Sequence, residues 1–299
     1  PEVKEISDRV TVLRDGKLVS AHLSSDLQPS DMARLMVGRD VAKLYPDRVS
    51  QHDNAAILDV DNFSVPGYVQ NARFHLNRGE ILGFAGLVGA GRTELMEGIV
   101  GLRSGKGDVR HNGKPVHFRN AHESQKAGIV YLSEDRKGKG LLLSKDLGVN
   151  LTLASLKKFV SGLQIDRNRE RAALDDAIRE FDIRTGRKDI LAGQLSGGNQ
   201  QKLLLAKMMM LDPSIVIMDE PTRGIDVGTK EQIYQFIANL ADEGKSIIVV
   251  SSEMPELIGI CDRVVVMREG RIAGEVSGER MTEHDIVVLA TGVEAENAA

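Results

Sequence analysis

The sequence is poor in cysteine, in long apolar runs and in surplus charge of either sign. Cys261 is the only cysteine among 299 residues, which excludes an internal disulfide and fits a reducing compartment. The longest apolar runs, such as residues 247–250, are too short to span a bilayer, and no secretory signal opens the chain. The 39 Lys and Arg residues nearly balance 43 Asp and Glu residues without forming a basic block, which argues against nucleic-acid binding. We therefore expect a soluble intracellular protein.

Part of the chain is repeated. Residues 1–38 recur at residues 255–292 without a gap, and both copies contain an Asp-Arg-Val triplet, which begins at Asp8 and at Asp262. Ungapped agreement over this length argues against chance similarity between two strand-turn-strand units. The chain is therefore predicted to be an excised fragment of a longer protein. The predicted parts are the C-terminal tail of a preceding domain (1–39), a linker (40–55), a complete domain (56–294) and a C-terminal tail (295–299).

Strand and helix patterns alternate within the predicted complete domain. Buried parallel strands are predicted for four short apolar runs, at residues 80–85, 129–132, 214–218 and 246–250. The alternation predicts an open α/β sheet, in which ligands bind at the carboxyl ends of the strands. The stretch from about residue 143 to residue 195 is rich in helical patterns, and we predict that it is a helical insertion.

A glycine-rich turn follows the first of these strands and has the spacing of a phosphate-binding P-loop, with arginine at the usual lysine position. Its glycines let backbone N–H groups face a phosphate, and the helix that follows adds the positive end of its dipole. The predicted nucleotide-binding residues of this turn are Gly86, Gly89, Ala90, Gly91, Arg92 and Thr93. The hydroxyl of Thr93 would also bind Mg²⁺. For this motif alone, a purely structural turn stays a valid alternative.

The apolar strand at residues 214–218 ends in two carboxylates, Asp219 and Glu220. This pattern, known as Walker B, predicts that Asp219 holds Mg²⁺. It also predicts that Glu220 is the catalytic residue that orients and deprotonates the attacking water. Acid pairs at strand ends also serve as helix N-caps, so the interpretation depends on the other motifs in the chain.

A second candidate anion site lies between these two motifs. It consists of Ser196, Gly197, Gly198 and Asn199, and a helix is predicted from about residue 200 to residue 210. A hydroxyl and two glycines at the N-terminus of a helix can bind an anion. An ordinary N-cap would explain this segment alone, but its position between a P-loop and an acid pair favours nucleotide binding.

The motifs in this order closely resemble the nucleotide-binding domains of ABC transporters, whose signature sequence is the Leu-Ser-Gly-Gly segment. We therefore call residues 196–199 the signature segment. The resemblance covers about residues 55–293, and residues 1–39 resemble the end of a preceding copy. It implies an α/β P-loop NTPase core of the ABC type with a mixed sheet, an antiparallel β subdomain and a helical insertion. Several segments resemble more narrowly the second half of the tandem ATPase of bacterial ribose, galactose and xylose importers, namely residues 86–95, 133–137, 195–202, 219–226 and 250–257.

Three positions depart from the pattern of the family. Arg92 replaces the P-loop lysine, and its planar guanidinium cannot act as a compact point charge among the phosphates. Glu134 stands where the resemblance implies a glutamine near the nucleotide, and Ser252 stands where it implies a histidine. The three changes predict that this P-loop site hydrolyses ATP poorly, although Glu220 is present. Tyr68 is a candidate for the aromatic residue that stacks on adenine, but an ordinary loop tyrosine is the favoured interpretation.

The resemblance implies an ATP-hydrolysing subunit, with ATP and Mg²⁺ as cofactors, that drives uptake of a simple sugar. It would be peripheral, at the cytoplasmic face of the bacterial inner membrane. The implied partners are the preceding ABC domain of the same polypeptide, membrane permease subunits and, indirectly, a periplasmic sugar-binding protein, with no nucleic acid. Two alternatives stay open: a soluble ABC ATPase that acts outside transport, and a regulatory domain that binds nucleotide without turnover. The sequence does not identify the sugar.

Overall fold

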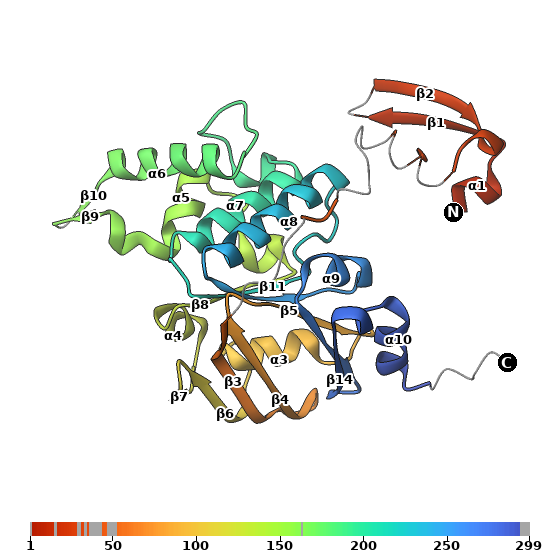
Figure 1. Ribbon diagram of the computed structural model, residues 1–299. Helices are drawn as coiled ribbons and strands as arrows, with labels where there is room; N and C mark the ends of the chain where they lie inside the picture. The colour runs from red at the N-terminus through yellow and green to blue at the C-terminus, as the bar shows by residue number, and fades with distance from the viewer. Residues whose placement is uncertain are drawn as a thin grey trace.

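The computed structural model describes residues 2–14, 17–28, 31–32, 35, 44–46, 53–162 and 164–293. A six-stranded sheet forms the middle layer of the main body (Figure 1). Helices α7 (Gly197–Met209) and α8 (Val227–Asp242) pack on one face, whereas helix α3 (Arg92–Ile99) and a four-stranded sheet pack on the other. Among the described residues, no helix combines the length and the apolar character that a bilayer crossing requires.

The strands of the central sheet are β5 (Ile81–Gly86), β8 (Ile129–Leu132), β11 (Ile215–Asp219), β12 (Ser246–Val250), β13 (Arg263–Arg268) and β14 (Arg271–Ser277). Their order across the sheet is β14-β13-β5-β12-β11-β8. Neighbouring strands are parallel except for β13 and β14, which are antiparallel, so the sheet is mixed. The four predicted parallel strands are confirmed as β5, β8, β11 and β12, and their ends differ from the prediction by at most one residue.

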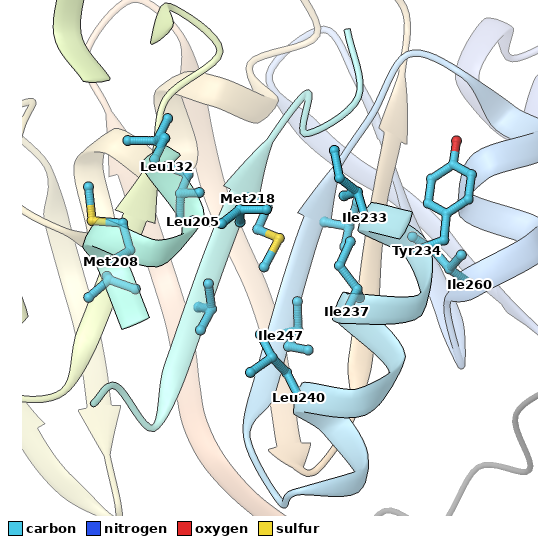
Figure 2. Close-up of a cluster of buried hydrophobic side chains, with 14 of the residues drawn as sticks. Leu132, Leu205, Met208, Met218, Ile233, Tyr234, Ile237, Leu240, Ile247 and Ile260 are labelled. Atoms are coloured by element: carbon cyan, nitrogen blue, oxygen red, sulfur yellow. The ribbon is translucent and has the colours of Figure 1, made fainter. Parts of the chain in front are cut away.

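Alternate residues of the central strands face two different apolar cores. Ile247 and Val249 of β12 lie in the core beneath α7 and α8, whereas Ile248 and Val250 lie in the core beneath α3. Figure 2 shows part of the first core, where side chains from α7 and α8 pack over Met218 and Ile247. Because successive side chains of a strand point to opposite faces, a strand covered on both faces has a continuous apolar sequence.

The antiparallel sheet has the strand order β4-β3-β6-β7. Its strands are β3 (Asp53–Val65), β4 (Val69–Arg78), β6 (Lys106–His111) and β7 (Lys114–Val116), and a short helix, α4 (Ala121–Lys126), follows them. β3 begins at Asp53, inside the predicted linker and slightly before the predicted domain start at residue 56. This sheet packs against α3 and the central sheet through one shared apolar core.

The segment predicted as a helical insertion contains short helices and one small hairpin. Its elements are α5 (Leu147–Thr152), η4 (Leu153–Phe159), β9 (Val160–Ser161), β10 (Gln164–Ile165), α6 (Arg167–Glu180) and η5 (Ala192–Gln194). A single turn, η3 (Arg136–Gly140), precedes them after β8. Leu147, Leu151 and Leu174 are buried in the same core as α7, so this segment packs directly against the helix that carries the signature segment.

The N-terminal elements form a separate hairpin at one side of the main body (Figure 1). They are α1 (Glu2–Ile6), β1 (Arg9–Arg14), β2 (Lys17–Leu23) and η1 (Ser24–Asp26). The C-terminal part of the chain has the corresponding elements α9 (Met254–Ile260), β13, β14, η6 (Gly278–Arg280) and a last helix, α10 (Glu283–Thr291).

Residues 44–46, in the middle of the predicted linker, lie against the main body. The ring of Tyr45 lies 5.2 Å from the ring of Tyr234 in α8, measured between centroids. It also covers Gly259 of α9 so closely that no Cβ could be accommodated there. The rest of the predicted linker before Asp53, and the predicted tail at residues 295–299, lie outside the described residues.

Candidate functional site

The turn between β5 and α3 has the backbone geometry of a phosphate-binding loop. Gly86, Gly89 and Gly91 have positive φ angles of 152°, 82° and 95°, which residues other than glycine rarely adopt. A Cβ on Gly86 would lie 2.5 Å from the carbonyl oxygen of Met267, and a Cβ on Gly91 would lie 2.9 Å from that of Tyr68. No side chain caps the start of α3, so its first N–H groups face the turn unblocked. The turn can therefore bind a phosphate with backbone donors.

Asp219, buried at the carboxyl end of β11, and Thr93, half-buried in the first turn of α3, provide oxygen atoms for a cation. Asp219 is 2% exposed, and its Oδ2 accepts a hydrogen bond of 2.8 Å from the hydroxyl of Tyr131. Its Oδ1 has no hydrogen-bond partner among the residues that the structure describes. Burial raises the pKa of Asp219, and the nearby hydroxyls of Tyr131 and Thr93 partly offset this shift. An orphaned carboxylate oxygen near a threonine hydroxyl fits the oxygen ligands that Mg²⁺ prefers.

The carboxylate of Glu220 is held by two neighbours. Its Oε2 accepts a hydrogen bond of 3.2 Å from Ser252, and its Oε1 lies 3.9 Å from Nη2 of Arg92. Both charged side chains of this ion pair are 9% exposed. Burial raises the pKa of Glu220, whereas Ser252 and Arg92 oppose this shift. Arg92 also donates a 2.5 Å hydrogen bond to the carbonyl oxygen of Ser251, so its guanidinium is engaged in the protein interior.

Glu134 lies in the loop after β8 and is partly exposed. Its carboxylate forms an ion pair with Arg223, which follows the acid pair in sequence. Among the described residues, no hydrogen bond or ion pair joins Glu134 to the P-loop turn. The structure therefore places Ser252, Arg92 and Glu220 in one cluster, and it places Glu134 beside the segment that follows Glu220.

The signature segment lies at the start of α7. Ser196 is the N-cap, and its Oγ accepts hydrogen bonds from the backbone and side-chain nitrogens of Asn199, at 3.4 and 2.9 Å. A Cβ on Gly198 would lie 2.9 Å from the side chain of Thr229 in α8, so this glycine permits close packing of the two helices. Since α3 and α7 pack on opposite faces of the central sheet, the structure does not bring the signature segment to the P-loop turn.

Sequence reasoning missed two buried side chains at this edge. Tyr131, which donates to Asp219, is in a predicted strand, and strand alternation could have placed it on the α3 face. Glu256 is 1% exposed, and it accepts hydrogen bonds from Thr222, at 2.8 Å, and from Ser251. Glu256 thus ties the loop after β11 to the loop after β12, which are the two loops around Glu220. Its sequence context, between Pro255 and Leu257, gives no signal of this role.

Tyr68 lies next to the P-loop turn. Its carbonyl oxygen packs against Gly91, and its side chain is 48% exposed. The guanidinium carbon of Arg103 lies 4.6 Å from the centroid of its ring, within the range of a cation–π contact. This position is compatible with base stacking and with a loop tyrosine, so both interpretations stay open.

A strand, a glycine-rich turn and a helix, with a buried acid pair at the end of another parallel strand of the same sheet, define the class of P-loop nucleotide-binding proteins. A family model described as "ABC transporter" matches residues 69–223, which is just over half of the chain. The chain belongs to the ABC transporter family. The resemblance inferred from the motifs is thereby confirmed.

Individual relatives agree with this assignment. The chain is 47% identical over 295 residues to "Ribose import ATP-binding protein RbsA 2" of Rhizobium meliloti, covering 98% of this chain and 57% of that protein. It is 43% identical over 292 residues to "Ribose import ATP-binding protein RbsA" of Clostridium tetani, covering 97% of this chain and 57% of that protein. The chain thus spans less than three fifths of the length of these curated relatives.

Solved structures confirm the predicted fold class. A nucleotide-free ATP-binding cassette from an ABC transporter superposes with a TM-score of 0.67 at 19% identity, covering 78% of this chain and 96% of that chain. The dimeric bacterial ABC transporter cassette MJ0796 superposes with a TM-score of 0.65 at 19% identity, covering 74% of this chain and 98% of that chain. At this level of identity the likeness concerns the fold alone.

Proposed function

We propose that the chain is the C-terminal nucleotide-binding domain of the ATP-binding subunit of an ABC importer for a simple sugar. The ribose import proteins among its relatives, which are 43–47% identical to it, support this substrate class. In this arrangement the N-terminal hairpin is the end of a preceding ABC domain in the same polypeptide, and the linker is residues 40–55, with β3 beginning near its end at Asp53. The repeated sequence and the repeated hairpin support that organisation.

The domain binds ATP at the P-loop turn. Backbone N–H groups of Gly89 and Gly91 and of the first turn of α3 receive the phosphates, whereas that of Ala90 donates to the carbonyl oxygen of Leu87. Arg92 adds positive charge nearby. Asp219 and Thr93 hold Mg²⁺, which, when bound, offsets the charge of the phosphates. The observation that carries this part of the proposal is the buried Oδ1 of Asp219, which has no hydrogen-bond partner at the edge of an uncapped helix start.

Turnover at this site is slow. As a general base, Glu220 would have to accept a proton from water. One of its carboxylate oxygens faces Arg92, however, and the other accepts a hydrogen bond from the hydroxyl of Ser252. Ser252 stands where the family resemblance implies a histidine, and a neutral hydroxyl cannot supply a cationic contact to the γ-phosphate. The site thus retains the groups that bind Mg-nucleotide and lacks an unhindered general base.

The signature segment acts on a different nucleotide, held by the P-loop of the preceding domain. The two domains pair head to tail, and their closure is passed to membrane permease subunits through the helical segment at 143–195 and the loop at 134–146. A periplasmic sugar-binding protein delivers the sugar to that permease, and the subunit works at the cytoplasmic face of the inner membrane. An alternative is a regulatory domain that binds nucleotide without turnover, which the pairing of Arg92 with Glu220 favours for the isolated domain.

Calorimetry and an ATPase assay on the purified chain test the proposal. We expect weak ATP binding that requires Mg²⁺ and negligible hydrolysis. Robust Mg²⁺-dependent hydrolysis that disappears in Glu220→Gln would contradict the slow-site proposal, and absence of binding would contradict nucleotide binding itself. Co-purification of the tandem protein with a multi-span permease would separate transport from a soluble ABC ATPase that acts on ribosomes or DNA.

A further inference from the structure

Arg136 reaches the start of α7 from the turn after β8. A Cβ on Gly197 would lie 3.7 Å from Nη2 of Arg136, and a Cβ on Gly224 would lie 3.8 Å from the same atom. Gly197 belongs to the signature segment, and Gly224 belongs to the loop that follows Glu220. The two glycines therefore flank the guanidinium without a side chain that could cover it.

Arg136 has no counter-ion among the described residues, unlike Arg223 and Lys139 nearby. Its guanidinium makes no hydrogen bond and no ion pair within the described part of the chain, although it is only partly exposed. Nearby, Arg223 is paired with Glu134, and Lys139 is paired with Glu97. The side chain of Asp135, the preceding residue, accepts the backbone N–H of Gly138. Burial lowers the pKa of Arg136, and no carboxylate offsets this shift.

A partly buried cation without a partner is costly unless an anion joins it. The surroundings of Arg136 favour an anion with several oxygens. The first turn of α7 has no acidic residue, and the start of a helix attracts negative charge. A guanidinium matches two oxygens of a phosphate with a pair of parallel hydrogen bonds, which a lysine cannot do.

We propose that Arg136 binds the terminal phosphate of the nucleotide that the preceding domain holds against the signature segment. This inference rests on the proposed function. Arg136 is then a catalytic residue of that composite site: it stabilises the negative charge that develops on the phosphoryl oxygens as water attacks and ADP leaves, and it takes no proton itself. Removal of one preorganised donor of this kind lowers the turnover rate by about 10²–10³-fold.

The experiment compares variants of the full-length tandem protein by steady-state ATPase kinetics. Arg136→Ala should lower kcat by about 10²-fold, with a much smaller change in KM. Arg136→Lys, which retains the charge and loses the paired donors, should fall between wild type and Arg136→Ala. Lys137→Ala is the matched control, because Lys137 is the next residue, is exposed and is not placed at the site. Lys137→Ala should keep wild-type kcat.

Ser196→Arg, which blocks the signature segment itself, separates the role of Arg136 from the existence of the composite site. If Ser196→Arg abolishes turnover while Arg136→Ala keeps it, the role of Arg136 is overturned and the proposed function stands. If both variants keep turnover, the composite site is overturned as well. An equal loss in Lys137→Ala would show an effect of loop charge and would also overturn the role of Arg136. Should Arg136→Ala fail to fold, an unchanged kcat in a folded Arg136→Lys would count against the proposal.

Discussion

The starts of α3 and α7 are both helix N-termini in glycine-rich sequence, yet their surroundings differ. At α3 the cap is Gly91, which has no side chain, and the buried carboxylates of Asp219 and Glu220 lie at the carboxyl end of β11 in the same sheet. At α7 the cap is the hydroxyl of Ser196, no acidic residue occupies the first turn, and the unpaired Arg136 lies beside it. The α3 start can hold a nucleotide together with its metal. The α7 start offers only donors, so it suits a phosphate whose metal is held elsewhere.

The two helices also differ in where they lie relative to the central sheet. α3 and α7 lie on opposite faces of the central sheet, so their starts do not converge on one ligand within a domain. Under the proposed head-to-tail pairing, one domain carries half of each of two composite sites. Variants at the two helix starts should therefore act on different nucleotides, and the tandem protein can separate their effects.

The largest expected effect belongs to the α7 start. Gly198→Asp in the tandem protein should lower ATPase activity by about 10²–10³-fold, as loss of a preorganised donor does. The new side chain would clash with Thr229, because a Cβ on Gly198 would lie only 2.9 Å from the Thr229 side chain. It would also place negative charge at the proposed phosphate contact. ATP binding at this domain's own P-loop, measured by calorimetry on the purified chain, should persist.

Gly186→Asp is the matched control for this variant, because Gly186 is exposed and a Cβ there meets nothing within 4 Å. It should keep wild-type ATPase activity. If Gly198→Asp retains full turnover, the assignment of catalysis to the α7 start is wrong.

The sequence predicted the strands and motifs well, because each depends on local pattern. The run Ile247–Val250 is apolar at every position, as a strand covered on both faces requires, and the glycines of the P-loop stand where positive φ is needed. The bond between Tyr131 and Asp219 could not be predicted in this way. It depends on β8 lying next to β11 in a register that pairs Tyr131 with Ile217. The register between strands far apart in the chain cannot be predicted from the sequence of either strand alone.

The two copies of the repeated hairpin show in the same way which features follow from local sequence and which follow from tertiary contacts. β1 and β2 have the bounds of β13 and β14 shifted by 254 residues, and both pairs shift register at the same step. Leu13 is nevertheless 59% exposed, whereas its counterpart Met267 is fully buried. β13 pairs with β5 in the central sheet, whereas within the described part of the chain β1 pairs with β2 alone. The repeat determined the hairpin, and the neighbouring strand determined the burial.

An intermediate effect is expected at the α3 start from Tyr131→Phe. This change removes the hydroxyl that orients Asp219 and leaves the ring in place. Loss of such an outer-shell partner lowers metal affinity by about 10–100-fold. We expect the ATP affinity of the purified chain to fall by about 10-fold in the presence of Mg²⁺. The melting temperature should match that of wild type, and a clearly lower melting temperature would mean that Tyr131 supports the fold and not the metal.

The smallest expected effect is that of Arg92→Ala on ATPase activity of the tandem protein. Arg92 is the residue at the P-loop lysine position, but its guanidinium donates to the carbonyl of Ser251 and lies near Glu220. If turnover takes place at the other composite site, losing this cation should lower kcat by less than about tenfold, the equivalent of 1.36 kcal/mol in barrier height. The melting temperature of Arg92→Ala should be measured together with its ATPase activity, because Glu220 loses its ion pair with Arg92 in this variant. A loss as large as that of Gly198→Asp, in a protein that melts like wild type, would mean that both sites turn over together. A loss of ATPase activity in Arg92→Ala without a loss in Gly198→Asp would assign catalysis to the α3 start instead of the α7 start.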